Sequence, residues 1–192
     1  MNVSLAPLPT DVRNIPDWTP DWAPFAVLPR DARPKGPRAI TSSEGIGDRL
    51  RAAAFAEIQA YYAFLWAAER FTDAPDALRL NWRGLAIAEE RHLGWLLNRM
   101  TELGVDVQER GVSDWLWTSL LNCKDAREFA IYIANSEERG RLAGVRFCEA
   151  MMTVDPTTAK IFGKIAEEEV EHIRLAGKFF PDTPAIGPED VR

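Results

Sequence analysis

The sequence predicts an all-α protein, built as a four-helix bundle with one long crossover between its second and third helices. Apolar residues recur every three to four positions through four long segments, the spacing of one face of a helix. Runs of valine and isoleucine bounded by turns, which would indicate strands, are absent. The longest link between helical segments lies between the second and the third, as in bundles with one crossover.

The first two helices are expected over residues 43–71 and 74–103. Thr41 and Glu44 have the spacing of a capping box before the first of them. Asp73 and Pro75 suit the start of the second, and Gly104 suits its end. A short connection of this kind predicts that the two helices run antiparallel.

The other two long helices are expected over residues 124–151 and from Pro156 to about residue 178. Asp155 and Pro156 together form a strong start signal for the last one. Within the long link, residues 113–117 (SDWLW) predict an additional short helix. We therefore expect four long helices and one short one.

Proline content divides the chain into three parts. Eight of the thirteen prolines fall within residues 1–40, a density that excludes a long helix there. Trp18 and Trp22 argue against a freely solvated tail. We therefore expect a proline-rich arm over 1–41 that packs on the bundle, a helical bundle over 42–180, and a C-terminal tail over 181–192.

The composition excludes several classes of protein. The chain has 192 residues, 46% of them hydrophobic, which suits one folded domain. Its net charge of −6 argues against a broad nucleic-acid surface, and its two cysteines are too few for a disulfide scaffold. Neither a secretory signal nor a membrane span is evident, so we expect a cytoplasmic protein.

Glutamate and histidine recur in a matched pattern that predicts a metal site. The chain has two histidines, and each follows a glutamate by three positions, which places the pair on one face of a helix. A further glutamate precedes each pair at the same interval, and the second set repeats the first at a constant offset in residue number. The two sets are Glu57, Glu89 and His92, and Glu137, Glu169 and His172.

Charge and geometry explain why these residue types would occur together. The glutamates share helix faces with apolar residues, and burying ionised carboxylates is costly unless a cation compensates them. Four carboxylates and two neutral imidazoles carry a charge of −4, which two divalent metal ions would neutralise. Oxygen and imidazole ligands favour iron or manganese, so we expect two irons, with Mn/Fe or Mn/Mn as alternatives.

Two alternatives remain open at this stage. A Glu-x-x-His pair is also common as a surface contact on a helix, so the pairs could lack any metal. On the third helix, Glu137 fits the constant offset between the two sets, whereas Glu138 has more apolar neighbours at helical spacing. We prefer Glu137 as the ligand.

These motifs resemble the ferritin-like superfamily over about residues 48–178. Residues 57–64 (EIQAYYAF) with 68–71 (AERF) resemble the first metal-binding helix of bacterioferritins. Residues 87–92 (IAEERH) with 102–104 (ELG) resemble more closely an uncharacterised bacterial ferritin-like family. The resemblance implies a di-iron or mixed-metal site on four helices.

Further motifs of that uncharacterised family are matched in part. Asp114, Leu116 and Trp117 match its Asp-Gly-Leu-Trp motif, and the proline-rich arm also fits. A Glu-Ala-Arg-Gly motif is matched by residues 137, 139 and 140, but Glu138 stands in place of its alanine. The usual Leu-Asp that follows is replaced by residues 141–142 (RL).

The sequence predicts an oxygen-dependent di-iron enzyme that oxidises or hydroxylates a small organic substrate, with an external electron donor. The alternatives are a ferroxidase or peroxide scavenger, and a helical binding protein with a relic metal site. A homodimer is compatible with the pattern. Nucleic acid is disfavoured by the net charge, although Arg30, Arg33, Lys35 and Arg38 could form a local basic patch.

Overall fold

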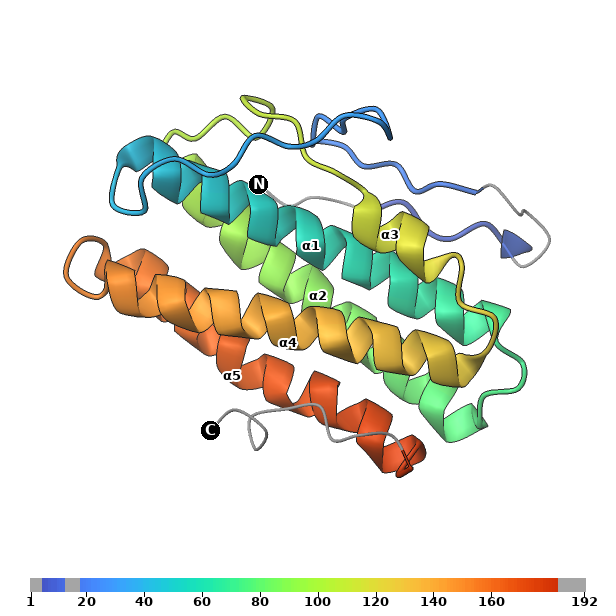
Figure 1. The fold of residues 1–192 in the computed structure, drawn as a ribbon. Helices are drawn as coiled ribbons and strands as arrows, with labels where there is room; N and C mark the ends of the chain where they lie inside the picture. The colour runs from blue at the N-terminus through green and yellow to red at the C-terminus, as the bar shows by residue number, and fades with distance from the viewer. Residues whose placement is uncertain (1–4, 13–17, 183–192) are drawn as a thin grey trace. The chain divides into compact units, whose positions relative to one another are not determined.

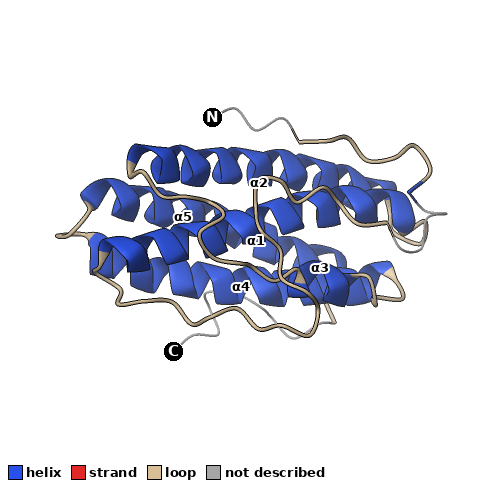
Figure 2. Cartoon of the chain, turned by 90° about the horizontal axis from the view of Figure 1, so that it is seen from above, coloured by secondary structure: helices blue, strands red, loops and turns tan. Residues whose placement is uncertain are grey.

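The computed structural model describes residues 5–12 and 18–182, and within these residues the regular structure is helical. The chain divides into two compact units, residues 1–122 and 123–192. Figure 2 shows helices and loops only, and the described residues contain no named strand. Val27 and Val112 form an isolated bridge within the first unit.

Helix α1, Ser43–Arg70, begins one residue later than a cap at Thr41 would place it. Ser42 is the N-cap, and its side-chain oxygen accepts a hydrogen bond from the backbone N–H of Gly45 at 3.0 Å. The expected capping box at Thr41 is therefore wrong by one position. Both residues carry a hydroxyl suited to this role, so the sequence could not distinguish them.

Helix α2, Asp76–Glu102, packs along α1 in the first unit (Figure 1). The short connection between them makes the two helices an antiparallel hairpin. At its end Gly104 adopts a φ of 65°, the left-handed conformation that glycine reaches without steric cost. The hairpin core consists of fully buried apolar side chains: Leu50, Ile58, Leu78, Leu93, Leu96 and Met100.

The short helix α3, Trp115–Leu120, and the described part of the arm pack on α1. The buried amide of Gln59 accepts a hydrogen bond from the backbone N–H of Trp117 at 3.0 Å, which ties α3 to α1. From the arm, Trp22 makes edge-on ring contacts with Phe55, Tyr62 and Trp117. These contacts hold the arm against α1 and α3 in the first unit.

The second unit is a hairpin of α4, Ala126–Met151, and α5, Pro156–Phe179. Asp125 and Asp155 are the N-caps, and each carboxylate accepts a hydrogen bond from a backbone N–H in the first turn of its helix. Phe147 of α4 and Phe162 of α5 meet nearly at right angles, with ring centroids 4.7 Å apart. This aromatic pair joins the two helices of the hairpin.

The expected long helices agree with the observed ones to within about two residues, and the short helix in the link is present. Most of the expected C-terminal tail, residues 183–192, lies outside the described residues, as do residues 1–4 and 13–17 of the arm. None of the described helices combines the length and the hydropathy that crossing a membrane would require.

Candidate metal centre

In the first unit, α1 and α2 bring Glu57, Glu89 and His92 together. The Nδ1 atom of His92 lies 3.4 Å from a carboxylate oxygen of Glu57 and 3.8 Å from one of Glu89. One ligand atom from each of the three residues lies within 4.8 Å of the others. We call this group trio one.

In the second unit, α4 and α5 bring Glu137, Glu169 and His172 together in the same way. The Nδ1 atom of His172 lies 3.8 Å from a carboxylate oxygen of Glu137 and 3.3 Å from one of Glu169. These three ligand atoms also lie within 4.8 Å of one another. We call this group trio two.

The spacing of the ligand atoms in each trio suits one metal ion. Two atoms bound to one ion at about 2.1 Å, at angles of about 90–130°, stand about 3.0–3.8 Å apart. The four distances from histidine nitrogen to carboxylate oxygen, 3.4 and 3.8 Å in trio one and 3.8 and 3.3 Å in trio two, fall within that range. In each trio, therefore, the histidine nitrogen stands at a distance from both carboxylate oxygens that a shared metal ion would allow.

Burial and charge favour a cation in the same place. The Glu89 and His92 side chains are 1% and 0% exposed, and the side chains of trio two are 6–8% exposed. With a neutral imidazole each trio carries a charge of −2, which one divalent cation balances. Carboxylate oxygen with imidazole nitrogen is a donor set that iron and manganese accept.

An aromatic side chain of α2 contacts His92 of trio one. The ring of Trp95 lies against His92, with centroids 5.4 Å apart, and the guanidinium carbon of Arg91 lies 5.6 Å from the Trp95 ring centroid. Trp95 follows His92 by three positions, so the helical spacing places them on one face. The sequence interpretation did not single out Trp95, although this spacing would have identified it.

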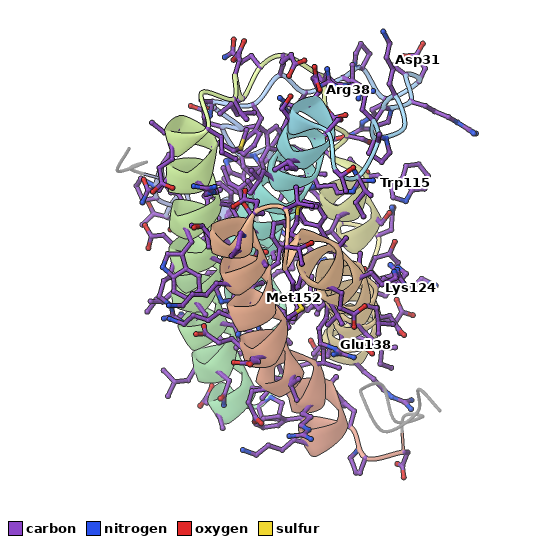
Figure 3. All side chains as sticks on the ribbon, turned by 90° about the vertical axis from the view of Figure 1, so that its left-hand side faces the viewer. Asp31, Arg38, Trp115, Lys124, Glu138 and Met152 are labelled. Atoms are coloured by element: carbon purple, nitrogen blue, oxygen red, sulfur yellow. The ribbon has the colours of Figure 1, made fainter. Side chains whose placement is uncertain are left out.

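Glu138 (labelled in Figure 3), the alternative ligand on α4, lies in a different environment from Glu137. Both of its carboxylate oxygens accept hydrogen bonds from Arg141, at 2.6 and 2.9 Å. This ion pair neutralises the buried Glu138 carboxylate within α4. The structure places Glu137 in trio two and gives Glu138 an arginine partner; metal binding by either remains a prediction.

The two tyrosines that follow Glu57 differ in their surroundings. Burial raises the pKa of Tyr61, with a smaller contribution from the Glu90 charge. Burial also raises the pKa of Tyr62, to about 12, and its hydroxyl donates a hydrogen bond to the carbonyl oxygen of Ala6 at 3.2 Å. The hydroxyl of Tyr62 therefore serves the contact between the arm and α1.

Comparison with solved structures identifies the fold. The chain is similar to a dodecameric thioferritin of the bacterial domain, the bacterioferritin-related protein from Bacteroides fragilis. The TM-score is 0.62 at 22% sequence identity, over 73% of this chain and 87% of that one. This likeness confirms the expected all-α, ferritin-like bundle. No functionally curated protein matches the chain.

A match between the amino-acid sequence and a family model identifies the family. The family model described as "Protein of unknown function (DUF455)" matches residues 12–184, from within the arm to beyond the end of α5. Both trios lie inside the matched range. A match of this extent means that the chain belongs to the DUF455 family.

Proposed function

We propose that the six residues of the two trios bind two metal ions, and that the protein is an oxygen-dependent di-iron oxidoreductase. The observation that carries this proposal is the matched pair of Glu-Glu-His trios, each with the charge and ligand spacing for one divalent ion. In ferritin-like di-iron proteins, two helices each supply a Glu and two others each supply a Glu-x-x-His. This chain offers that set of ligands in a ferritin-like fold.

The donor set is the test of whether iron fits. The six side chains supply carboxylate oxygen and imidazole nitrogen and no thiolate, which suits iron or manganese and argues against a structural zinc site. Together they carry a charge of −4, the charge that two divalent ions neutralise. The proposed ligands are Glu57, Glu89, His92, Glu137, Glu169 and His172.

When bound, the metal pair would supply the redox chemistry that couples dioxygen reduction to oxidation of a small organic substrate. The residues of the chain have other tasks. The carboxylates would balance the positive charge of the ions, and the helix pairs fix the imidazoles in place. Trp95 packs against His92 and limits its rotation. The burial of Glu89 and His92 keeps bulk water away from that part of the site.

Iron handling is a second candidate function, and one observation favours it. The similar solved structure is that of a thioferritin, related to bacterioferritin, and it is dodecameric. In this alternative iron would be the substrate, oxidised at the same six ligands and passed on. A resident di-iron centre and a ferroxidase differ in how many ferrous ions they consume per chain.

The first experiment measures metal content. Protein reconstituted without oxygen with ferrous iron or manganese, then desalted, should retain about two ions per chain by mass spectrometry. Glu89→Gln and Glu169→Gln should each reduce this content. Glu90→Gln and Glu167→Gln, which change exposed carboxylates on the same helices, are the controls and should retain the metal.

The second experiment separates the two functions. Ferrous iron is added in increments to the loaded protein in air, and oxygen uptake is recorded. A resident centre stops consuming oxygen once the centre is oxidised and resumes only with reductant and an organic substrate. A ferroxidase continues through many equivalents of iron. Metal content below half an ion per chain would refute both and leave a helical binding protein with a relic site.

The oligomeric state also distinguishes the two candidate functions. A storage function would require a large closed assembly that encloses the iron, whereas the proposed oxidoreductase requires no such assembly. Light scattering coupled to size-exclusion chromatography measures the mass of the assembly directly. A dodecamer would favour iron handling, and a monomer or homodimer would favour the oxidoreductase.

A further inference from the structure

A basic cavity lies in the first unit, between the arm and the link that follows α2. It measures about 530 Å³ and is lined by Leu28, Gly111 and five charged residues: Arg33, Lys35, Arg38, Glu109 and Arg110. Cavities that bind small molecules measure about 300–1,000 Å³. In a chain with a net charge of −6, the lining of this cavity carries +3.

The backbone of the cavity is held by contacts between distant segments. The backbone N–H of Leu28 donates to the carbonyl of Val112 at 2.8 Å, and that of Val112 donates to the carbonyl of Ala26 at 2.9 Å. The guanidinium of Arg110 donates to the carbonyl of Gly36 at 3.0 Å. The arm and the link therefore form one wall each of a preformed cavity.

Asp48 of α1 fixes two of the lining arginines. Its carboxylate accepts hydrogen bonds from the guanidinium of Arg38, at 2.9 and 2.7 Å, and from that of Arg110. The hydrogen bond from Arg38 is the largest of the causes that hold the pKa of Asp48 well below its usual range. Figure 3 shows Arg38 near the start of α1. These two guanidinium groups are thus held in place at the cavity before any ligand arrives.

The single carboxylate in the lining is already neutralised. Glu109 forms ion pairs with Arg38 at 2.9 Å and with Arg51 at 3.1 Å. Among the described residues, Arg33 and Lys35 form no ion pair. The excess positive charge of the cavity therefore comes mainly from these two side chains.

We propose that this cavity binds a small molecule that carries a phosphate group. Planar guanidinium groups match the geometry of phosphate oxygens, and Lys35 adds a mobile cation. The nearby prolines, Pro34 and Pro37, limit the conformations of the loop that carries Lys35, which reduces the entropy lost on binding. This site is separate from the two trios, and the proposal does not depend on the proposed metal centre.

The test is calorimetric titration of the full-length protein with pyrophosphate and with adenosine monophosphate. Arg33→Ala/Lys35→Ala removes the two unpaired cations and should weaken binding at least about tenfold, since each charge-assisted contact is strong. The control Arg30→Ala/Lys124→Ala changes the net charge equally at exposed residues outside the lining, and should change binding less than about twofold. Both variants alter exposed side chains, and circular dichroism verifies their folding.

Three results would overturn the proposal. One is the absence of pyrophosphate and nucleotide binding to the wild-type protein. Another is an equal loss in the two double variants, which would indicate attraction by net charge alone. The third is tighter binding of a single-stranded RNA oligonucleotide than of either small probe, which would assign the surface to a macromolecule. None of these measurements requires bound iron, so failure here leaves the proposed metal centre unaffected.

Discussion

Replacing Asp48 with asparagine tests the charge network that joins α1, the arm and the link after α2. The Asp48 side chain is 5% exposed, and its carboxylate pairs with Arg38, Arg51 and Arg110. The guanidinium of Arg51, 2% exposed, also donates to the carbonyl of Asp106 at 2.7 Å. Asp48→Asn removes the negative charge but keeps the size of the side chain.

The expected cost is large because three cations lose a shared partner. Removing one partner of a buried ion pair costs about 3–5 kcal/mol. Asparagine keeps one oxygen acceptor, and Arg51 keeps Glu109 and two backbone carbonyls, so we expect the low end, about 3 kcal/mol. For a chain of this length that corresponds to a decrease of about 6–12 °C in Tm.

The assay is thermal and urea unfolding at pH 7, followed by circular dichroism at 222 nm. The control is Asp76→Asn in the first turn of α2, whose side chain is fully exposed and pairs with Arg79 at 3.5 Å. A surface pair of this kind contributes less than about 1 kcal/mol. A loss below about 1 kcal/mol for Asp48→Asn would refute the reasoning that this network is buried and cooperative.

The stability difference between the wild-type protein and Asp48→Asn should depend on pH. The folded protein holds the pKa of Asp48 well below its usual range, first through the hydrogen bond from Arg38. A lowered pKa contributes stability that is present above the unfolded pKa of about 3.9 and is lost as the pH falls below it. The difference in unfolding free energy between wild type and Asp48→Asn should therefore shrink from pH 6 toward pH 3. A constant difference across that range would contradict the assignment.

Three further predictions concern single residues. Glu137→Gln should reduce the iron content of the reconstituted protein, whereas Glu138→Gln, which alters only the carboxylate paired with Arg141, should leave it unchanged by mass spectrometry. Absorbance at 295 nm should show a tyrosine that ionises with a pKa of about 12 and is absent in Tyr62→Phe. Because folding raises the pKa of Tyr62, the stability that its neutral hydroxyl contributes is present below pH 10 and is lost as the pH rises toward 12. Gly104→Ala should cost about 1 kcal/mol in urea unfolding because its φ is 65°, whereas Gly84→Ala in the interior of α2 should stabilise by about 0.5–1 kcal/mol; equal effects would contradict this account.

Helix ends were predictable where one side chain determines them. Asp155 accepts a hydrogen bond from the first turn of α5 and Gly104 follows the end of α2, so local chemistry located these two boundaries. The N-cap of α4, Asp125, was not identified from the sequence, and the expected start at residue 124 lies two residues before the observed one. The start of α1 was less certain from the sequence because adjacent residues, Thr41 and Ser42, both suit a cap. The structure uses Ser42, whose backbone is extended with its hydroxyl toward Gly45.

The basic cavity could be predicted only in part. Its arm residues, Arg33, Lys35 and Arg38, are close in sequence and suggested a basic patch. Arg110 lies far along the chain from them, and Asp48 lies on α1, so no local period connects these two residues to the arm. Tertiary contacts, not sequence pattern, determine which of these charges face the cavity and which neutralise one another.

The repeated ligand pattern has a simple geometric origin in each helical hairpin. The interval from Glu57 to Arg70, the last residue of α1, has the same length as the interval from Asp76, the first residue of α2, to Glu89. Because the helices are antiparallel, at about 1.5 Å per residue both glutamates stand at the same height, about 20 Å from the connecting turn.

The second hairpin repeats this arrangement to within a single position, because Glu137 and Glu169 stand almost equally far from the facing ends of α4 and α5. The interval between the glutamates of each trio therefore consists of two helical stretches of nearly equal length and a short turn. Inserting one residue into one of these helical stretches would rotate its glutamate by about 100° and remove it from the trio. The same insertion in the turn would leave both heights unchanged. The repetition seen in the sequence is thus a repetition of a hairpin that assembles three ligands by itself.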